Sequence, residues 1–596
     1  MNPSDVAALK EALDAARTRL LAERGPEGHW VGELSSSALS TATAVAALAL
    51  VDSSAHQSLI RGGLDWLARH RNPDGGWGDT VRSASNLSTT ALAWAAFGAT
   101  GKMPVLAETE AWLARAAGGL EPERVARAIV ARYGGDRTFS APILTMCALG
   151  GRLGEGRGAW RHVAPLPFEL AAFPHRLFRW LRLPVVSYAL PALIAIGQAR
   201  FHHAPPRNPV ARLARRLVRR KTLRVLQSTQ PESGGFLEAM PITSFVTMSL
   251  ASIGEARHPV AAKGVEFLRR TVRDDGSWPI DADLATWVTT LAVNALGAAL
   301  PDEARQPIRD WLLAQQHVVE HPYTHAAPGG WAWTDLSGGV PDADDTAGAL
   351  LALRQLLGGP RSASSPSAIA SGASWLLDLQ NRDGGIPTFC RGWGKLPFDR
   401  SAPDLTAHAL LAWHAWLNEL PPQLRPRVEA AMRRAVAFLA ASQRPDGSWL
   451  PLWFGNEAAP DEANPTYGTA RVLMALAELA TRRPAAVRPM LERGAHWLLA
   501  AQNPDGGWGG APGVPSSIEE TALTVDALCR LALASAQSAI SSGVRWLIER
   551  TDCGRSFPPA PIGLYFAKLW YFEKLYPLLF TVGALERALE LTRRPR

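Results

Sequence analysis

The sequence is poor in cysteine. Its 596 residues include four cysteines, and none of them belongs to a CxxC pair. This scarcity excludes a disulfide framework and a zinc ribbon, and it fits reduced thiols in the cytosol. Residues 1–25 mix acidic and basic side chains and lack an apolar core, so we expect no secretory signal peptide. We therefore expect a cytoplasmic protein.

A convincing membrane-spanning run is also missing. The seventeen uncharged residues from Leu183 to Ala199 are short for a span and contain Pro191. We expect a buried or interfacial helix there. A basic stretch follows: Arg212, Arg215, Arg216, Arg219, Arg220, Lys221 and Arg224. Its charge suits nucleic acid or anionic lipid, or simply a solvated face, and electrostatics alone does not choose among them.

Most of the chain has a helical pattern. Ala- and Leu-rich segments such as DDTAGALLALRQLL repeat apolar residues at steps of three and four. Between them, turns of the type QRPDGSW and QNPDGGWG recur. Their glycines at 276, 330, 384, 447 and 506 lie 54, 54, 63 and 59 residues apart. A period of this size predicts a repeating helical pair that closes into a solenoid or barrel.

The repeated turns have a structural explanation. Glycine permits a tight exit from a helix, Asp or Asn hydrogen-bonds the turn, and Trp packs beneath it. Gln is suited to stack on the Trp and cap a neighbouring helix. We therefore assign these turns to the scaffold, without a role in chemistry.

An acidic cluster carries the strongest chemical signal. Asp342, Asp344 and Asp345 stand within four positions at the predicted start of an apolar helix. Crowded carboxylates in an apolar cavity cannot all ionise, so at least one should hold a proton at neutral pH. Protonating an alkene also needs a partner that stabilises the carboxylate left behind. His408 is the candidate, with Asp404 one turn earlier to orient it. Taken alone, such a cluster is more often an N-cap or metal site, and such a histidine a core residue.

The QxxxGxW turns, the DxDD cluster and the later DxTxH segment together resemble squalene–hopene and oxidosqualene cyclases, which are class II terpene cyclases. The resemblance covers nearly the whole chain. It implies an all-α fold of two α/α barrels with a cavity between them. Residues 24–281 would form one barrel with a membrane-facing segment, and residues 1–23 plus 282–596 the catalytic barrel.

The resemblance also implies roles for individual residues. Asp344 would deliver the proton, Asp342 and Asp345 would tune it, and His408 would hold the opposite oxygen. Tyr467 would help to recharge the acid. The predicted substrate- and cation-binding residues are Trp331, Trp333, Trp287, Trp453, Tyr565 and Glu33, and the predicted substrate channel contains Phe389 and Cys390. Aromatic faces suit this task because they attract cations and are poor nucleophiles.

Some segments depart from the family pattern. Residues 86–92 and 238–241 lack acids and a glutamine that hopene cyclases carry, and a loop is inserted before Tyr467. A segment containing Tyr565 replaces the C-terminal GFPGDF. These changes spare initiation and alter termination, so the reaction class is better defined than the product.

More than one function fits this pattern. The leading expectation is proton-initiated cyclisation of squalene to a hopene-like or other polycyclic triterpene. A class II cyclase of a shorter, diterpenoid or partly cyclised prenoid is the alternative. A non-catalytic α/α-repeat scaffold that binds lipid or protein explains the turns, but it requires neither the aspartates nor His408. A protein prenyltransferase β subunit would need a zinc site and a helical partner.

No cofactor or metal is expected. Class I prenyl-diphosphate chemistry normally uses DDxxD magnesium ligands, which are not evident. His317, His321 and His325 are spaced for zinc along one helix face, but Pro322 argues against a continuous helix there. The expected partners are a polyprenoid and, as for a monotopic protein, the inner face of the cell membrane, without nucleic acid. A homodimer is implied only by the resemblance.

Overall fold

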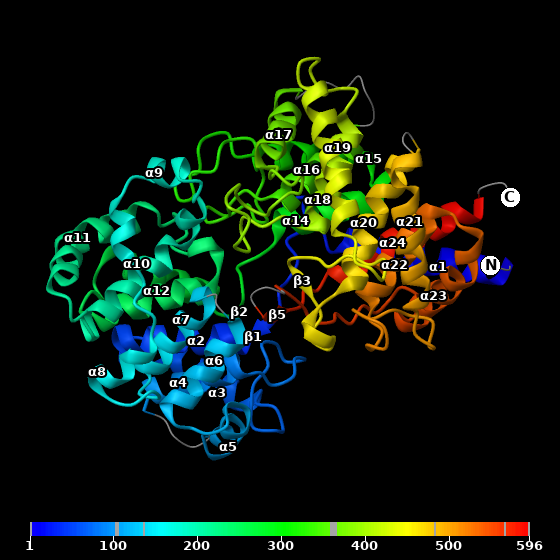
Figure 1. Cartoon of the computed structure of the whole chain (residues 1–596). Helices are drawn as coiled ribbons and strands as arrows, with labels where there is room; N and C mark the ends of the chain where they lie inside the picture. The colour runs from blue at the N-terminus through cyan, green and yellow to red at the C-terminus, as the bar shows by residue number, and fades with distance from the viewer. Residues whose placement is uncertain are drawn as a thin grey trace.

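The structure is a computed structural model, and it describes residues 3–101, 106–134, 137–357, 366–481, 484–564 and 568–593. The described chain is predominantly helical, with few strands. Its helices pack into two barrels, which lie side by side in Figure 1. The predicted all-α fold of two α/α barrels is confirmed.

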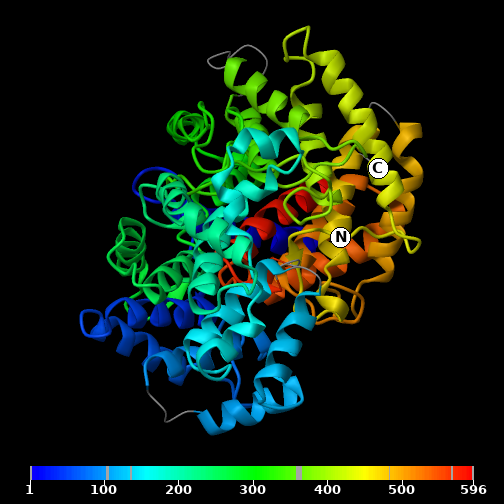
Figure 2. The ribbon, with the colours of Figure 1, turned by 60° about the vertical axis from the view of Figure 1, so that its left-hand side comes forward.

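The larger barrel has a closed inner ring in which each helix packs against the next and the last packs against the first. The inner helices are α14 (Ala285–Leu296), α16 (Ala343–Leu356), α18 (Pro403–Trp416), α20 (Pro465–Ala480), α22 (Ile518–Leu531) and α24 (Tyr576–Arg593). The outer helices are α15 (Asp302–Ala314), α17 (Pro366–Leu379), α19 (Arg425–Ser442), α21 (Pro484–Ala500), α23 (Gln537–Arg550) and α1 (Pro3–Ala22). The N-terminal helix α1 packs against the C-terminal helix α24, as Figure 2 shows in blue and red.

The smaller barrel follows the same plan. Its inner ring consists of α2 (Ala38–Asp52), α4 (Leu87–Ala99), α7 (Arg137–Leu149), α10 (Val185–His203) and α12 (Met240–Ser252). The helices outside this ring are α3 (Gln57–Arg69), α5 (Leu106–Ala117), α6 (Pro122–Tyr133), α11 (Pro209–Ser228) and α13 (Pro259–Thr271), and two short helices are α8 (Gly156–Ala159) and α9 (His175–Trp180).

Sequence pattern separates inner from outer helices. Inner helix α2 is apolar or small on every side and almost entirely buried, because neighbours surround it. Outer helix α3 is amphipathic: Leu64, Trp66 and Leu67 are buried, whereas Asp65 is exposed.

The apolar segment 183–199 becomes inner helix α10, and the basic stretch becomes α11 on the outside of the ring. The buried-helix interpretation of residues 183–199 therefore holds.

Each barrel has its own hydrophobic core. One core combines residues of α1 with those of α14–α24, and the other contains residues 38–278. This division is close to the predicted one, although the limits at 24, 281 and 282 stay a prediction. A smaller apolar cluster joins the barrels, with Tyr188 of α10 beside Tyr323 and Cys390.

Short strands lie between the barrels (Figure 1). Strand β1 (Ser36–Ser37) pairs with β2 (Trp278–Pro279), and β3 (Phe454–Gly455), β4 (Ile562–Leu564) and β5 (Leu569–Tyr571) form an antiparallel sheet in that order. In the second sheet Phe454 faces Leu564, and Gly563 faces Trp570. These pairings bring the C-terminal segment beside the insertion that precedes α20.

The repeated turns connect neighbouring helices as their composition predicts. In the turn at 443–449, Gly447 has φ +96°, and a Cβ there would lie 2.7 Å from the carbonyl oxygen of Arg493. The Gln443 side chain donates to the carbonyls of Gly447 at 2.8 Å and of Met490 at 3.1 Å. It therefore ties the turn to outer helix α21. Within the described ranges, no helix combines the length and apolar character needed to cross a bilayer.

Candidate active site

The acidic cluster lies at the start of inner helix α16. Asp342 is the N-cap residue, and its Oδ1 accepts hydrogen bonds from the amides of Asp344 and Asp345, both at 2.9 Å. The amide of Asp342 donates to the carbonyl of Trp331, and that of Ala343 donates to Thr388. The N-capping interpretation is thus correct for Asp342, and it leaves the other two carboxyls free of that task.

Asp344 and His408 form a close pair. His408 lies on α18, and its Nδ1 is 2.5 Å from Oδ1 of Asp344. Asp342 and Asp345 are buried, whereas Asp344 is partly exposed, so Asp344 is the accessible acid. Burial raises the pKa of Asp344. The charge and hydrogen bond of His408, with a further contribution from Arg471, outweigh burial and hold that pKa below its ordinary value. A protonated Asp344 is therefore a strong acid.

The other two aspartates form a second pair. Burial, together with the charge of Asp344, raises the pKa of Asp342 to about 7. Burial and the charges of both neighbours raise the pKa of Asp345 well above its ordinary value. Like charges this close cannot both ionise cheaply, so Asp342 and Asp345 hold a proton at neutral pH. The cluster thus places a proton store beside a strong acid.

We expect Asp345→Asn to stabilise the fold at about pH 8. The pKa of each paired acid is higher in the folded chain than in the unfolded one. The resulting destabilisation grows as pH rises above the ordinary value of 3.8 and levels off above the folded value, about 7 for Asp342. An amide at 345 removes one charge, so the gain in Tm should be larger at about pH 8 than at about pH 5.

Thermal unfolding followed by circular dichroism at both pH values measures this gain. Asp310→Asn is the control, because Asp310 is an exposed side chain paired with Arg309. An equal gain at both pH values, or a loss of Tm at the higher pH, would contradict the assignment of a shared proton.

Asp404 does not have the predicted arrangement. It lies in the first turn of α18, one turn before His408, but the histidine nitrogen Nδ1 faces Asp344 instead. Neither carboxylate oxygen of Asp404 has a hydrogen-bond partner among the described residues. Burial and the charge of Asp344 raise the pKa of Asp404 to about 7. We therefore correct its role: it adds a further protonatable group beside the pair and does not hold the imidazole.

Predicted aromatic residues lie on segments next to the acid. Phe389 makes edge-to-face contacts with Trp453 at 5.7 Å and with Trp333 at 6.4 Å between ring centroids. The indole of Trp453 donates to Thr388 at 2.6 Å, on the same segment whose carbonyl binds α16. All three rings are half-buried. They form one aromatic cluster near the start of the acid helix.

Trp287 and Tyr467 lie at the starts of other inner helices. Trp287 on α14 contacts the His408 ring edge-on at 6.3 Å and donates to the Tyr576 hydroxyl at 3.0 Å. The ring of Tyr467 on α20 lies tilted against that of Phe454, with 4.6 Å between centroids, and the negative charges of Asp344 and Asp404 act on its hydroxyl. Burial raises the pKa of Tyr467 well above its ordinary value, so the hydroxyl stays protonated.

Trp331 has a different environment from the one predicted. It is fully buried, its amide donates to Thr346 at 3.0 Å, and its indole donates to the Leu312 carbonyl at 2.8 Å. The turn tryptophans Trp77, Trp278, Trp449 and Trp508 make the same pair of bonds to a threonine hydroxyl and a leucine carbonyl. The contacts of Trp331 therefore support a scaffold role and give no support to a role at the cation.

The predicted channel residues line a large pocket. Phe389 and Cys390 belong to a pocket of about 1180 Å³ between segments of the two barrels. The Tyr188 hydroxyl of α10 donates to the Phe389 carbonyl at 3.1 Å. Cations gather around this pocket: Arg179, Arg182, Arg382, Arg391 and Lys395.

The remaining predicted residues lie near the barrel junction or outside the described chain. The amide of Glu33 donates to the Glu573 carboxylate at 2.8 Å, and its own carboxylate interacts with Arg273. Glu33 is thus placed between the N- and C-terminal segments. Tyr565 lies outside the described residues. The three histidines spaced for zinc do not converge, because the two ring nitrogens of His321 face the Gly339 carbonyl and Thr324.

Sequence reasoning missed three residues of this region. Tyr571 and Tyr576 bring their hydroxyls to 3.2 Å of each other beside Trp287. Arg471, one turn after Tyr467, lies over its ring at 6.0 Å and acts on Asp344. The sequence shows that α20 and α24 carry apolar residues. It does not show which of their side chains point toward the acid.

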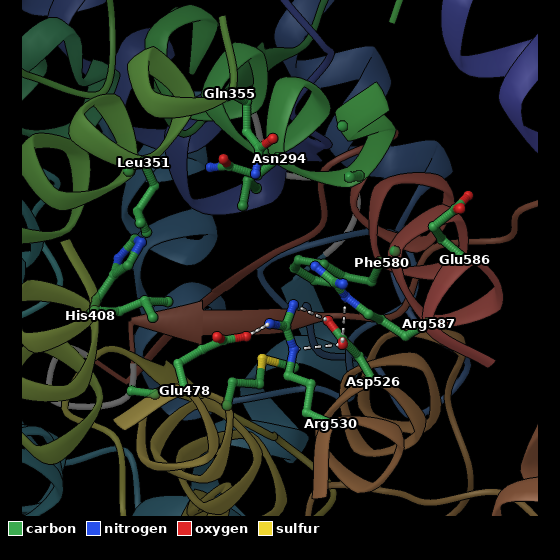
Figure 3. Close-up of a pocket in the computed structure, with 18 of the residues that line it drawn as sticks. Asn294, Leu351, Gln355, His408, Glu478, Asp526, Arg530, Phe580, Glu586 and Arg587 are labelled. Carbon is green, nitrogen blue, oxygen red and sulfur yellow. Dashed lines mark hydrogen bonds and ion pairs between the residues drawn. The ribbon is translucent and has the colours of Figure 1, made fainter. Parts of the chain in front are cut away.

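A second pocket, of about 540 Å³, lies in the centre of the larger barrel. Residues of all six inner helices line it, and His408 and Arg471 are among them. Figure 3 shows Arg530 between Glu478 and Asp526, with bonds of 3.1 and 2.8 Å. A pocket with charged side chains in its lining therefore reaches His408, the partner of Asp344, from within the barrel.

Comparison with known proteins agrees with this geometry. The squalene-hopene cyclase N-terminal domain model matches residues 13–182, and the corresponding C-terminal domain model matches residues 284–551. Enfumafungin synthase of Hormonema carpetanum is 32% identical over 379 residues, which is 57% of this chain and 27% of that protein. A squalene–hopene cyclase of Bradyrhizobium diazoefficiens is 27% identical over 57% of this chain and 54% of its own length. The chain thus spans about half or less of these relatives.

Among solved structures, ent-copalyl diphosphate synthase from Streptomyces platensis matches with a TM-score of 0.53 at 22% identity. The match covers 98% of this chain and 99% of that one. At this identity the likeness concerns the fold alone. The two domain models together span most of the chain and include both members of the Asp344–His408 pair. The chain therefore belongs to the class II terpene cyclase family.

Proposed function

We propose that this protein is an isomerase that cyclises squalene to a hopene-like pentacyclic or other polycyclic triterpene. The observation that carries the proposal is the 2.5 Å contact between Asp344 and His408 at the start of an inner barrel helix. An accessible acid with a lowered pKa, beside a carboxyl pair that holds a proton, suits alkene protonation. No cofactor enters this scheme.

The first step transfers the Asp344 proton to one carbon of a terminal alkene. The π electrons form the new C–H bond, and the adjacent carbon becomes a cation. Each following alkene attacks that cation, so one ring bond forms as the charge moves along the chain. Loss of a proton, or capture of water, ends the sequence. The Asp344 carboxylate left behind keeps the hydrogen bond to His408, which stabilises it.

The aromatic cluster of Trp333, Phe389 and Trp453 is proposed to face the migrating charge. These rings are half-buried, beside the segment that anchors α16, and the π face of an indole attracts a cation without trapping it. Trp287 is proposed to do the same next to His408.

Asp344 must regain a proton after each turnover. We propose that water in the pocket at the centre of the larger barrel supplies it, because His408 and Arg471 line that pocket. Tyr467 is proposed to take part, since its hydroxyl stays protonated and feels the charge of Asp344. Asp342 and Asp345 would hold the reserve proton beside the acid.

A class II cyclase of a shorter prenoid is the second candidate. The cations around the larger pocket favour it, because a diphosphate head group would need such charges. Similarity to a drimenyl diphosphate synthase of Streptomyces showdoensis also supports it, at 28% identity over 49% of this chain.

Incubation of the purified protein with squalene, and separately with farnesyl or geranylgeranyl diphosphate, distinguishes the two. Mass spectrometry of the extracts identifies isomeric or hydrated polycycles. Products from squalene alone support the first candidate, and products that retain a diphosphate support the second. Binding of prenoids without turnover would instead indicate a non-catalytic scaffold.

We also propose that the protein collects its substrate at the inner face of the cell membrane. An entrance patch of exposed apolar residues adjoins the larger pocket: Phe173, Trp180, Leu181, Trp393 and Leu396, with 53%, 78%, 40%, 62% and 42% exposure. The Trp393 indole donates to the Leu181 carbonyl at 3.1 Å, so the two parts of the patch touch. Arg179 and Lys395 lie beside it, suited to anionic lipid. A homodimer is proposed on family resemblance alone.

Replacing Trp180 and Trp393 together by serine should weaken binding to anionic liposomes about tenfold or more. The variant lacks the favourable free energy of transferring two indoles from water into the membrane. Cosedimentation with vesicles measures the change. Val210→Ser with Leu217→Ser is the control, since these residues are equally exposed on α11. If the tryptophan variant binds as the wild type does and the control variant binds more weakly, then α11, and not the entrance patch, contacts the membrane.

A further inference from the structure

Three potential metal ligands meet beside the larger pocket, and two of them line it. His175 begins α9, in the half of the chain that forms the smaller barrel, whereas Glu320 and His325 belong to the loop after α15 of the larger barrel. Nδ1 of His325 lies 3.0 Å from Oε1 of Glu320, and Nε2 of His175 lies 3.9 Å from the same oxygen. One donor atom of each residue lies within 4.8 Å of the other two.

The two imidazoles stack on each other. Their ring centroids are 3.6 Å apart with an interplanar angle of 16°. Each imidazole nitrogen directs its lone pair in the plane of its own ring. For both rings to bind one ion, one of them must therefore turn about its Cβ–Cγ bond out of this stack.

The loop conformation holds His325 toward its partners. His325 has φ +59°, an uncommon value for a residue other than glycine, and its amide donates to the His321 carbonyl at 2.8 Å. His321 is itself fixed by the Gly339 carbonyl and Thr324. Backbone strain of this kind is retained where the surrounding structure fixes it, and it suggests a function for the side chain.

We propose that His175, Glu320 and His325 bind a divalent transition metal of the zinc class. Two imidazole nitrogens and one carboxylate oxygen are a donor set that zinc accepts. Tetrahedral ligands at about 2.0–2.2 Å from the metal are roughly 3.3–3.6 Å from one another. The two nitrogens lie 3.0 and 3.9 Å from the Glu320 oxygen, and all three donor atoms lie within 4.8 Å, so a small adjustment brings them to that spacing. All three side chains are partly exposed, with 31%, 49% and 27% exposure, so a fourth position is open to water.

The site would join the two barrels at the pocket. His175 lies five residues before Trp180 of the entrance patch, and both histidines line the pocket with Phe389 and Cys390. A bound ion would hold the α9 segment against the loop at 318–327. This role is structural, and it does not depend on the proposed cyclisation, for which no metal is expected.

The full chain, freed of metal with a chelator, tests the proposal by titration with Zn²⁺ and with Co²⁺. We expect one more equivalent of zinc in the wild type than in His175→Ala/His325→Ala, and a visible Co²⁺ absorption band that the double variant lacks. Zinc in excess should raise the Tm of the wild type by roughly 3 °C or more and leave that of the double variant unchanged. Glu320→Gln should bind zinc at least about tenfold more weakly, because a neutral amide is a poor zinc ligand.

His202→Ala is the matched control, because His202 is an exposed histidine at the end of α10. It should bind zinc as the wild type does. The same zinc content in wild type and double variant, or no cobalt band in the wild type, would overturn the proposal. Circular dichroism of each variant confirms that it is folded, and the wild-type titration stands even where a variant is not.

Discussion

Asp344→Asn should lower the rate of product formation by about 10⁴-fold, which removes detectable turnover. An amide cannot give a proton to an alkene, and neither Asp342 nor Asp345 is as accessible or as acidic. The substitution keeps the size of the side chain and a hydrogen-bonding atom toward His408. The fold should therefore be retained, as circular dichroism would show, while gas chromatography with mass spectrometry finds no polycycle.

Asp310→Asn is the control for this loss, since it changes one exposed aspartate far from the acid in sequence and leaves the cluster intact. It should have wild-type turnover. If Asp344→Asn keeps its activity within about tenfold, Asp344 is not the acid. Asp404 then becomes the next candidate, because it lies one helical turn before the same histidine.

Trp331→Ala should lower the free energy of unfolding by about 3–5 kcal/mol. The indole is fully buried, and its two hydrogen bonds join the turn to α15 and α16. Its removal leaves a cavity under Gly372, where a Cβ would already lie 2.8 Å from the indole. Chemical denaturation measures the loss.

Trp331→Phe separates the two roles considered for this residue. A phenyl ring keeps an aromatic face but cannot donate to the Leu312 carbonyl, so stability should fall while the product stays the same. Trp180→Ala, at a residue with 78% exposure, is the control and should be nearly neutral. A stable Trp331→Phe variant with an altered product would restore the predicted role at the cation.

The sequence predicted the fold well for a physical reason. Inner helices of a barrel are apolar all round and outer helices are amphipathic, so α2 and α3 already differ in composition. The turn residues act locally: Gly447 needs its positive φ, and Gln443 bonds within its own turn. Such short-range requirements can be read from one chain without an alignment.

The candidate site was predicted less completely. The acid cluster lies within one helical turn, so its crowding and its cap were visible, and family resemblance linked it to His408. The orientation of a side chain on a helix depends on packing between distant elements. For this reason the sequence did not show that Asp404 lacks a hydrogen bond to the imidazole, that the Trp331 indole bonds to Leu312, or that Tyr576 lies beside Trp287.

The histidines show the same limit. The spacing of His317, His321 and His325 suits zinc only on a continuous helix, which Pro322 argued against, and the loop at 318–327 is indeed not a helix. His325 instead meets His175, which lies 150 residues earlier in the chain. Only the contact between the two barrels brings these rings together, and no local pattern encodes that contact.

Turnover of squalene in D₂O tests the central claim most directly. If Asp344 starts the reaction with a solvent-exchangeable proton, each product molecule should carry one deuterium, at the carbon protonated first, and be one mass unit heavier than the product made in H₂O. The Asp344→Asn variant should yield no product. A product without deuterium, or one whose formation survives the substitution, would contradict protonation of the substrate by this acid.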